Sequence, residues 1–299
     1  MNKKSEYSLS SDLVAVNLDV DFASSNPENT LLNNLREKGC AVIKNHSVPV
    51  HLLKDIFTQW GQFFASEEKF KWLRDEVTDE GYIPLHGEIA SKSDEPDFKE
   101  FFQAHYQCKL PSSINTESTN QMFESLVTLG NKICSLLDIA LPESVKKNMN
   151  MPLNKMVLGS KNHILRIMHY PPIEAGVHVP RSASHTDICL FTFVFGSTFK
   201  GLELQDQNGI WYAPEVEPTS VVIFNGDMLD MCTNGYLKSV AHAVKANPNS
   251  YTESRYSLPC GFHPLRGVTL TKDMTAGLAL RTRLNEMKYP VEKFSFEDH

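Results

Sequence analysis

The chain of 299 residues lacks the features that mark several common protein classes. No stretch approaches the roughly 20 consecutive apolar residues that a membrane-spanning helix needs, so none is predicted. The first residues, Met1 to Tyr7, include two lysines with no apolar segment behind them, so we expect no secretory signal. A Rossmann domain is disfavoured, because the glycine fingerprint and the alternation of strands and helices are both absent.

The sequence also lacks an excess of positive charge and any close pair of cysteines. Its 29 lysines and arginines stand against 36 aspartates and glutamates, which gives a net charge of −7. We therefore expect neither nucleic acid nor a membrane surface as a partner. The six cysteines include no C-x-x-C pair, which argues against a zinc knuckle or a disulfide framework. These patterns predict free thiols and a cytoplasmic protein.

What the sequence does contain is a change of apolar pattern near residue 150. Before it, apolar residues recur at steps of three and four over 53–64 and 123–137, which predicts two amphipathic helices. We interpret much of the polar stretch between them, residues 91–120, as loop or insert. After residue 150, apolar or alternating segments end at turns, which predicts strands at 164–170, 188–195, 201–205, 210–212 and 220–224. Several short strands at this spacing favour a barrel or jelly roll.

The candidate chemistry begins at His185-Thr186-Asp187, which opens an apolar segment. In extended backbone, side chains two residues apart point to the same face, so His185 and Asp187 can converge. His242, in a later β-type segment, is the natural candidate for a third ligand. Two histidines and one carboxylate leave positions on a metal open, which is typical of non-haem Fe(II) sites that activate O₂. A zinc hydrolase is disfavoured because its helical H-E-x-x-H motif is absent.

A second candidate site follows at Arg255-Tyr256-Ser257. Arg255 and Ser257 share a face of a predicted strand, so a guanidinium and a hydroxyl can bind one carboxylate. Taken singly, each of these motifs is also typical of ordinary structural residues. Their order within about 70 residues of one another makes a joint function the better interpretation.

In this order the motifs resemble the 2-oxoglutarate- and Fe(II)-dependent dioxygenase superfamily, in its isopenicillin N synthase-like branch. The resemblance extends over nearly the whole chain. The further segments that carry it are Gly39–His46, Phe63–Lys69, Gly81–Pro84, Asp97–Phe101, Arg166–Pro172, 201–203, 209–211, 225–227 and 234–235.

The resemblance implies a fold, a site and a reaction. The fold is mainly β with flanking helices: residues 151–299 form a double-stranded β-helix (jelly-roll) core, and residues 1–150 form a helical and mixed region packed on it as one structural unit. The implied ligands are His185, Asp187 and His242 for Fe(II), and Tyr170, Arg255 and Ser257 for the C5 carboxylate of 2-oxoglutarate. The reaction would consume O₂, with ascorbate as a candidate reductant, and would release succinate and CO₂ while a small molecule is hydroxylated, desaturated or cyclised. No catalytic residue is implied beyond the metal centre.

The chain departs from the family pattern at a few positions. Met168 stands where relatives often have asparagine, Ala243 follows the distal histidine where arginine is usual, and the segment from His242 to Arg255 is longer than in many relatives. None of these differences removes an implied ligand.

The sequence leaves open the residues of the substrate pocket and two alternative functions. Cys189, Phe191 and Phe262 are candidate pocket residues, although they are equally plausible in the hydrophobic core. One alternative is an Fe(II) oxidase of the isopenicillin N synthase or aminocyclopropane-carboxylate oxidase kind, which uses no 2-oxoglutarate. The other is a non-catalytic jelly-roll binding protein, which the intact motifs disfavour.

Overall fold

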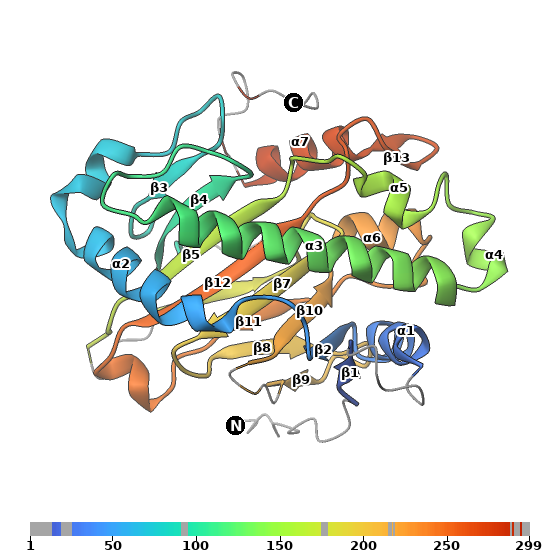
Figure 1. Ribbon diagram of the computed structural model, residues 1–299, viewed down its shortest axis with the longest axis horizontal. Helices are drawn as coiled ribbons and strands as arrows, with labels where there is room; N and C mark the ends of the chain where they lie inside the picture. Colours follow the sequence, from blue (N-terminus) through green and yellow to red (C-terminus); the bar gives the residue numbers. More distant parts are fainter. Residues whose placement is uncertain are drawn as a thin grey trace.

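Two β-sheets dominate the computed structural model, which describes residues 14–18, 26–90, 95–174, 179–214, 217, 219–287, 289 and 294 (Figure 1). The major sheet has the strand order β1 (Val16–Asn17), β2 (Cys40–Lys44), β10 (Val221–Asn225), β7 (Phe191–Ser197), β12 (Arg255–Phe262), β5 (Ile164–Tyr170), β4 (Glu100–His105), β3 (Gly81–Ile83). The minor sheet has the order β6 (Ser182–His185), β11 (His242–Val244), β8 (Leu202–Gln205), β9 (Trp211–Tyr212). A third, two-stranded sheet consists of β13 (Thr269–Thr271) and β14 (Met274–Thr275). The expected jelly-roll core with flanking helices is confirmed.

Strands from both halves of the chain pair within the major sheet. Strand β2 pairs antiparallel with β10, and β4 pairs antiparallel with β5. The described part of the chain before residue 150 therefore contributes four strands to this sheet, in addition to its helices. This pairing carries side chains of the first half of the chain to the strand that ends in Tyr170.

Helices cover one face of the major sheet. The two predicted helices are present as α2 (Leu53–Ala65) and α3 (Thr116–Ala140), and α3 runs across the sheet in Figure 1. Gly130 allows α3 to approach the sheet closely, because a Cβ at this position would lie 2.5 Å from the ring of Phe262 on β12. The other helical segments are α1 (Pro27–Glu37), α4 (Glu143–Lys146), α5 (Leu153–Val157), α6 (Asp227–Cys232), α7 (Ala276–Glu286) and the 3₁₀ turns Val50–Leu52, Glu67–Trp72 and Pro248–Tyr251.

The interpretation of residues 91–120 as mostly loop was wrong for part of the segment. Residues 91–94 lie outside the described residues, but β4 lies within the stretch and α3 begins before its end. Polar residues hid β4 from the apolar pattern because they are buried with partners. Lys69 Nζ lies 3.0 Å from a carboxylate oxygen of Glu100, and Gln103 Nε2 donates to the carbonyl of Asp79 at 2.6 Å. Burial with a partner is the usual condition for polar residues inside a sheet.

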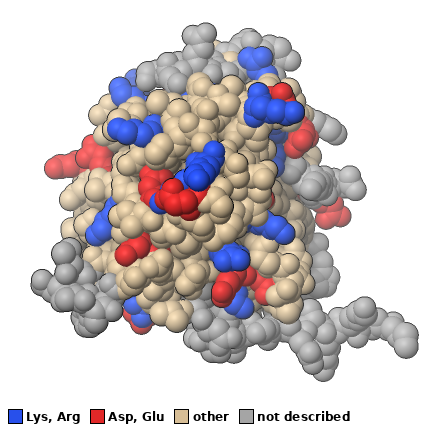
Figure 2. Space-filling model, turned by 90° about the vertical axis from the view of Figure 1, so that its right-hand side faces the viewer, with Lys and Arg blue, Asp and Glu red and all other residues tan. Residues whose placement is uncertain are grey.

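Two features of the described residues concern the expected partners: the apolar character of the helices and the distribution of surface charge. No helix among the described residues has the length and apolar character needed to cross a membrane. On the face shown in Figure 2, acidic and basic side chains are intermingled, without an extended area of one sign.

Candidate metal centre

Strands β6 and β11 bring the two candidate histidines side by side. His242 is the register partner of His185 across this antiparallel pair, and their ring centroids lie 4.2 Å apart. The expectation that the H-x-D motif opens an apolar strand was wrong, because β6 ends at His185 and β7 begins only at Phe191. Asp187 lies in the loop between them, where its carbonyl accepts from the backbone N–H of Asp227 at 2.8 Å.

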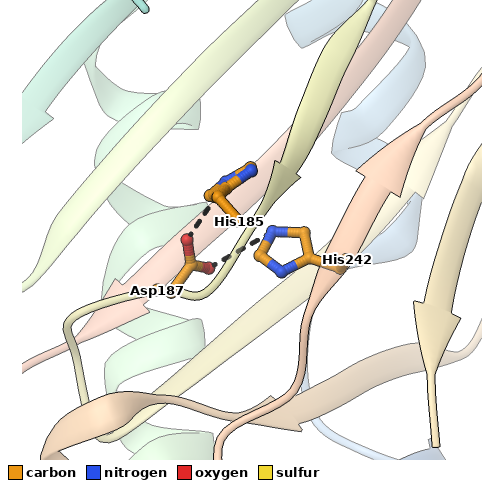
Figure 3. A group of neighbouring side chains, drawn as sticks. All are labelled: His185, Asp187 and His242. Carbon is orange, nitrogen blue, oxygen red and sulfur yellow. Dashed lines mark ion pairs between the residues drawn. The ribbon is translucent and has the colours of Figure 1, made fainter. Parts of the chain in front are cut away.

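The three side chains converge on one point (Figure 3). Nε2 of His185 lies 3.5 Å from Oδ1 of Asp187, and Nε2 of His242 lies 3.7 Å from Oδ2. One ligand atom from each residue lies within 4.8 Å of the other two. Among the described residues this is the one cluster of histidine, cysteine and carboxylate groups with the geometry to hold a metal ion.

Backbone carbonyls orient both imidazoles. Nδ1 of His185 donates to the carbonyl of Ala183 at 2.7 Å, and Nδ1 of His242 lies 3.4 Å from the carbonyl of Val240. A proton on Nδ1 leaves the lone pair on Nε2, which is the atom that faces Asp187. The carboxylate of Asp187 is held in turn by the hydroxyl of Thr192.

Burial and mutual interaction set the charge states of the triad. Burial lowers the pKa of His242 to about 4, so its imidazole is neutral near neutral pH. Burial opposes ionisation of Asp187, but at the low pH where this carboxyl titrates both histidines are protonated. Their charges, together with hydrogen bonds from His185 and Thr192, outweigh burial and hold the pKa of Asp187 below its usual range. For His185, burial disfavours the charged form, but Asp187 outweighs that effect and raises its pKa. A neutral His242 and an ionised Asp187 are the forms that bind metal.

A buried ion-pair network supports β6 from the side of β4. Oδ1 of Asp97 accepts from the backbone N–H of Ala183 at 2.8 Å, and the carbonyl of Ala183 holds His185. Lys99 Nζ lies 2.7 Å from Asp97 and 2.8 Å from Glu88. Sequence reasoning placed Asp97 and Lys99 only within a family-like segment. The signal available in the sequence was the presence of charged residues, Asp97 and Lys99, directly before the apolar pair Phe101–Phe102 of β4.

Helices α6 and α7 hold the loop that carries Asp187. Arg283 of α7 donates to the carbonyl of Thr186 at 2.6 Å and forms an ion pair with Asp227, whose carboxylate also accepts from the Thr186 hydroxyl at 3.2 Å. Gly226 is required here, because a Cβ would lie 2.2 Å from the carbonyl oxygen of Cys189. Asp187 is therefore fixed without belonging to a strand.

A cavity opens beside the triad and is lined by both sheets. Its volume is about 180 Å³, and the three candidate ligands line it. Tyr170 on β5 and Arg255 and Ser257 on β12 line it too. Arg255 is the register partner of Tyr170, so their side chains meet across neighbouring strands.

Arg255 is a buried cation without an acidic partner among the described residues. It is 3% exposed, and its Nε donates to the carbonyl of Phe199 at 3.1 Å. Its Nη1 is buried and has no hydrogen-bond partner. Burial lowers the pKa of Arg255. A buried guanidinium nitrogen without an acceptor is unfavourable, which indicates that an anionic ligand belongs in this part of the cavity.

Two family models match the chain. Residues 161–264 match the 2OG-Fe(II) oxygenase superfamily. Residues 21–125 match the family described as non-haem dioxygenase in morphine synthesis N-terminal, and the two ranges together cover more than half of the chain. The chain belongs to the 2OG-Fe(II) oxygenase superfamily.

Individual relatives agree with this assignment. A gibberellin 2-beta-dioxygenase from Phaseolus coccineus is 24% identical over 255 residues, which cover 80% of this chain and 74% of that protein. The 2-oxoglutarate-dependent dioxygenase ucsF from Acremonium sp is 25% identical over 274 residues, covering 79% of this chain and 81% of that protein. A solved Shewanella oneidensis protein assigned as an oxygenase has a TM-score of 0.79 and 28% identity, covering 93% of this chain and 100% of its own. The chain is thus an Fe(II)- and 2-oxoglutarate-dependent dioxygenase that oxidises a small molecule, as the motifs predicted.

The residues of this oxygenase fit both the metal and the cosubstrate. Two imidazole nitrogens and one carboxylate are the donor set of non-haem Fe(II) sites with open positions. The unpartnered Nη1 of Arg255, in the same cavity, fits a carboxylate of 2-oxoglutarate.

The three candidate pocket residues do not lie together. Cys189 lines the cavity, where its thiol donates to the carbonyl of Phe191 at 3.0 Å, and burial raises the pKa of that thiol. Phe191 and Phe262 are fully buried in the hydrophobic core and are not among the lining residues. Phe262 instead stacks on His163, with ring centroids 4.2 Å apart. Both phenylalanines therefore lie in the hydrophobic core, which was the alternative to the cavity wall that the sequence allowed.

Proposed function

We propose that His185, Asp187 and His242 bind one Fe(II), and that Tyr170, Arg255 and Ser257 bind the C5 carboxylate of 2-oxoglutarate. The observation that carries this proposal is the unpartnered guanidinium nitrogen of Arg255 in the cavity that the triad also lines. Bound Fe(II) with 2-oxoglutarate and O₂ supplies the oxidising chemistry, with release of succinate and CO₂. Ascorbate is the proposed external reductant.

The side chains of the oxygenase orient these groups and exclude water. The carbonyl of Ala183 keeps Nε2 of His185 available, and Thr192 keeps the carboxylate of Asp187 turned toward both histidines. Phe224 packs on the ring of His242, with centroids 4.6 Å apart, and shields that side of the site. No side chain needs to act as a general base, so we assign no catalytic residue beyond the metal centre.

We further propose that the enzyme belongs to the isopenicillin N synthase-like branch and hydroxylates, desaturates or cyclises a free small molecule. The dimensions of the cavity support a small molecule over a macromolecule. The net charge of −7 argues against nucleic acid as substrate. The six cysteines are free thiols, which favours a location in the reducing cytoplasm.

Anaerobic spectroscopy tests the proposal directly. Fe(II) and 2-oxoglutarate added to the wild type should produce a charge-transfer band in the visible range, and His185→Ala should produce none. With O₂ and ascorbate, the wild type should then release succinate. A band of wild-type intensity in His185→Ala would refute the ligand assignment. If the wild type shows no band and releases no succinate, the proposed use of 2-oxoglutarate is refuted.

A further inference from the structure

Arg166 is the most accessible charged side chain lining the cavity. It lies on β5, and its side chain is 33% exposed, against 5% for Glu88 and 3% for Lys99 on the same wall. Even Asp187, at the proposed metal site, is less exposed, at 25%. Arg166 is thus a cavity residue whose side chain a ligand can contact.

The neighbours of Arg166 hold its guanidinium in one orientation. Gln103 is its register partner on β4, and Nε of Arg166 donates to Oε1 of Gln103 at 2.8 Å. Nη1 donates to Oε1 of Glu88 at 3.2 Å, and the guanidinium carbon lies 4.7 Å from the ring centroid of Phe101. Neither of these two hydrogen bonds uses Nη2 of Arg166. A fixed guanidinium loses little conformational entropy when it binds a ligand.

Each acceptor atom of Glu88 and Gln103, the two residues that accept from Arg166, already has at least one donor partner. Oε1 of Glu88 accepts from Arg166 and from the Tyr289 hydroxyl at 3.2 Å, and Oε2 lies 2.8 Å from Lys99. Oε1 of Gln103 is already used by Arg166. The polar part of this wall therefore presents donors, and it selects a ligand that accepts hydrogen bonds.

Apolar side chains line other parts of the same cavity. Among them are Ile83, Met168, Leu280, Leu284 and Met287. A ligand that satisfies both parts has an apolar body and one strongly accepting end. Arg166 shares Glu88, its only carboxylate partner among the described residues, with Lys99. A carboxylate is an acceptor that a planar guanidinium binds through strong, charge-assisted hydrogen bonds.

We propose that the substrate of this oxygenase is a small carboxylic acid with a mainly apolar body, and that its carboxylate binds Arg166. The inference rests on the proposed function, because it takes the triad and Arg255 to be occupied by Fe(II) and 2-oxoglutarate. It assigns Arg166 as the residue that selects the substrate by charge.

The test measures binding of matched acids and amides to the anaerobic protein loaded with Fe(II) and 2-oxoglutarate. The probes are straight-chain and aryl-substituted monocarboxylates of increasing length and the primary amide of each. Binding is read from the shift of the charge-transfer band. In the wild type, acids should bind at least about tenfold more tightly than their amides, because the charge-assisted bond is lost in the amide.

Variants of Arg166 identify the residue responsible. Arg166→Gln should abolish the preference for acids, and Arg166→Lys, which keeps the charge without the planar fork, should retain part of it. The matched control is Arg74→Gln. Arg74 lines the same cavity but pairs with Asp79 and stacks on Tyr289, with its guanidinium carbon 4.1 Å from the ring centroid, so its loss should leave the preference intact.

The possible outcomes distinguish a failure of the inference about the substrate from a failure of the proposed function. If no band forms in the wild type, the proposed use of 2-oxoglutarate fails. If the band forms but no acid binds, or amides bind as tightly, or Arg166→Gln keeps the preference, only the inference about the substrate is overturned. An unchanged band in Arg166→Gln before any probe is added shows that this variant is folded and binds 2-oxoglutarate.

Discussion

Two sets of residues that line the cavity are built on opposite principles. The first, which we call the metal end, consists of His185, Asp187 and His242. The second, which we call the far wall, consists of Glu88, Lys99, Gln103, Arg166 and Tyr289, and Lys99 donates from it to Ser182 of β6 at 3.2 Å. The metal end gathers three groups that donate electron pairs, an arrangement that is favourable only with a cation or proton among them. The far wall pairs donors with acceptors, and Glu88 alone meets three of them.

This difference predicts how each end tolerates substitution. No residue can take over the role of a lost ligand at the metal end, because each ligand lies at a separate position and is held by its own hydrogen bonds. In the far wall, a lost contact leaves the remaining partners in place, since Lys99 and Glu88 each have more than one. The metal end should therefore respond sharply to single changes, and the far wall weakly.

The largest effect is expected from His242→Ala. The variant loses the proposed ligand that β11 supplies, and no other histidine, cysteine or carboxylate among the described residues completes the cluster. Since loss of a contact that merely supports a ligand already costs roughly 10–100-fold in metal affinity, Fe(II) binding should weaken by at least about 100-fold. Anaerobic Fe(II) titration measures this, with His51→Ala at an exposed position as the control. Retention of wild-type affinity would show that His242 is not a ligand.

Arg255→Ala should come next in size. Loss of a charge-assisted bond of about 1.5–3 kcal/mol should weaken 2-oxoglutarate binding by at least about tenfold. Arg255→Lys should recover part of that loss, because it restores the charge without the planar fork. The charge-transfer band, titrated with 2-oxoglutarate, reports the affinity, and Fe(II) binding should be unchanged. Equal affinity in wild type and Arg255→Ala would break the assignment of the anchor.

The comparison also explains which parts of the molecule were predictable from sequence. The residues of the metal end and of the proposed 2-oxoglutarate anchor lie in short segments, where spacing along a strand translates directly into a shared face. The exception is Asp187, which lies in a loop held by α6 and α7, so that Arg283, about 100 residues away, decides its position.

The far wall was not predictable for a physical reason. Its members come from β4, β5, the segment before β4 and the segment after α7, and no short motif joins them. Polar residues such as Gln103 and Glu100 suggested an exposed loop, although they are buried with partners. Phe191 and Phe262 illustrate the same limit, because apolar character does not distinguish a cavity wall from the core.

Asp97→Asn tests whether the two ends are coupled. Asp97 holds the peptide of Ala183, whose carbonyl orients His185, so a weaker acceptor at this position should loosen that ligand. Fe(II) affinity should fall by about tenfold, which is within the range for groups that support a metal ligand. Ser182→Ala is the control, because Ser182 contacts Asp97 without contributing to the Ala183 hydrogen bond. Unchanged Fe(II) affinity with normal thermal stability would mean that the far wall and the metal end are independent.

The smallest effect is expected from Tyr289→Phe. The change removes only the hydroxyl that donates to Glu88 at 3.2 Å, while Lys99 and Arg166 still satisfy that carboxylate. Burial raises the pKa of Tyr289, so the group that is lost is a neutral donor. One such hydrogen bond contributes about 0.5–1.5 kcal/mol, and the free energy of unfolding in urea should fall by no more than that. Tyr251→Phe, at an exposed position, controls for the substitution itself. Fe(II) affinity should be unchanged, and a loss of it, or of more than about 3 kcal/mol of stability, would show that the far wall depends on each of its members as the metal end does.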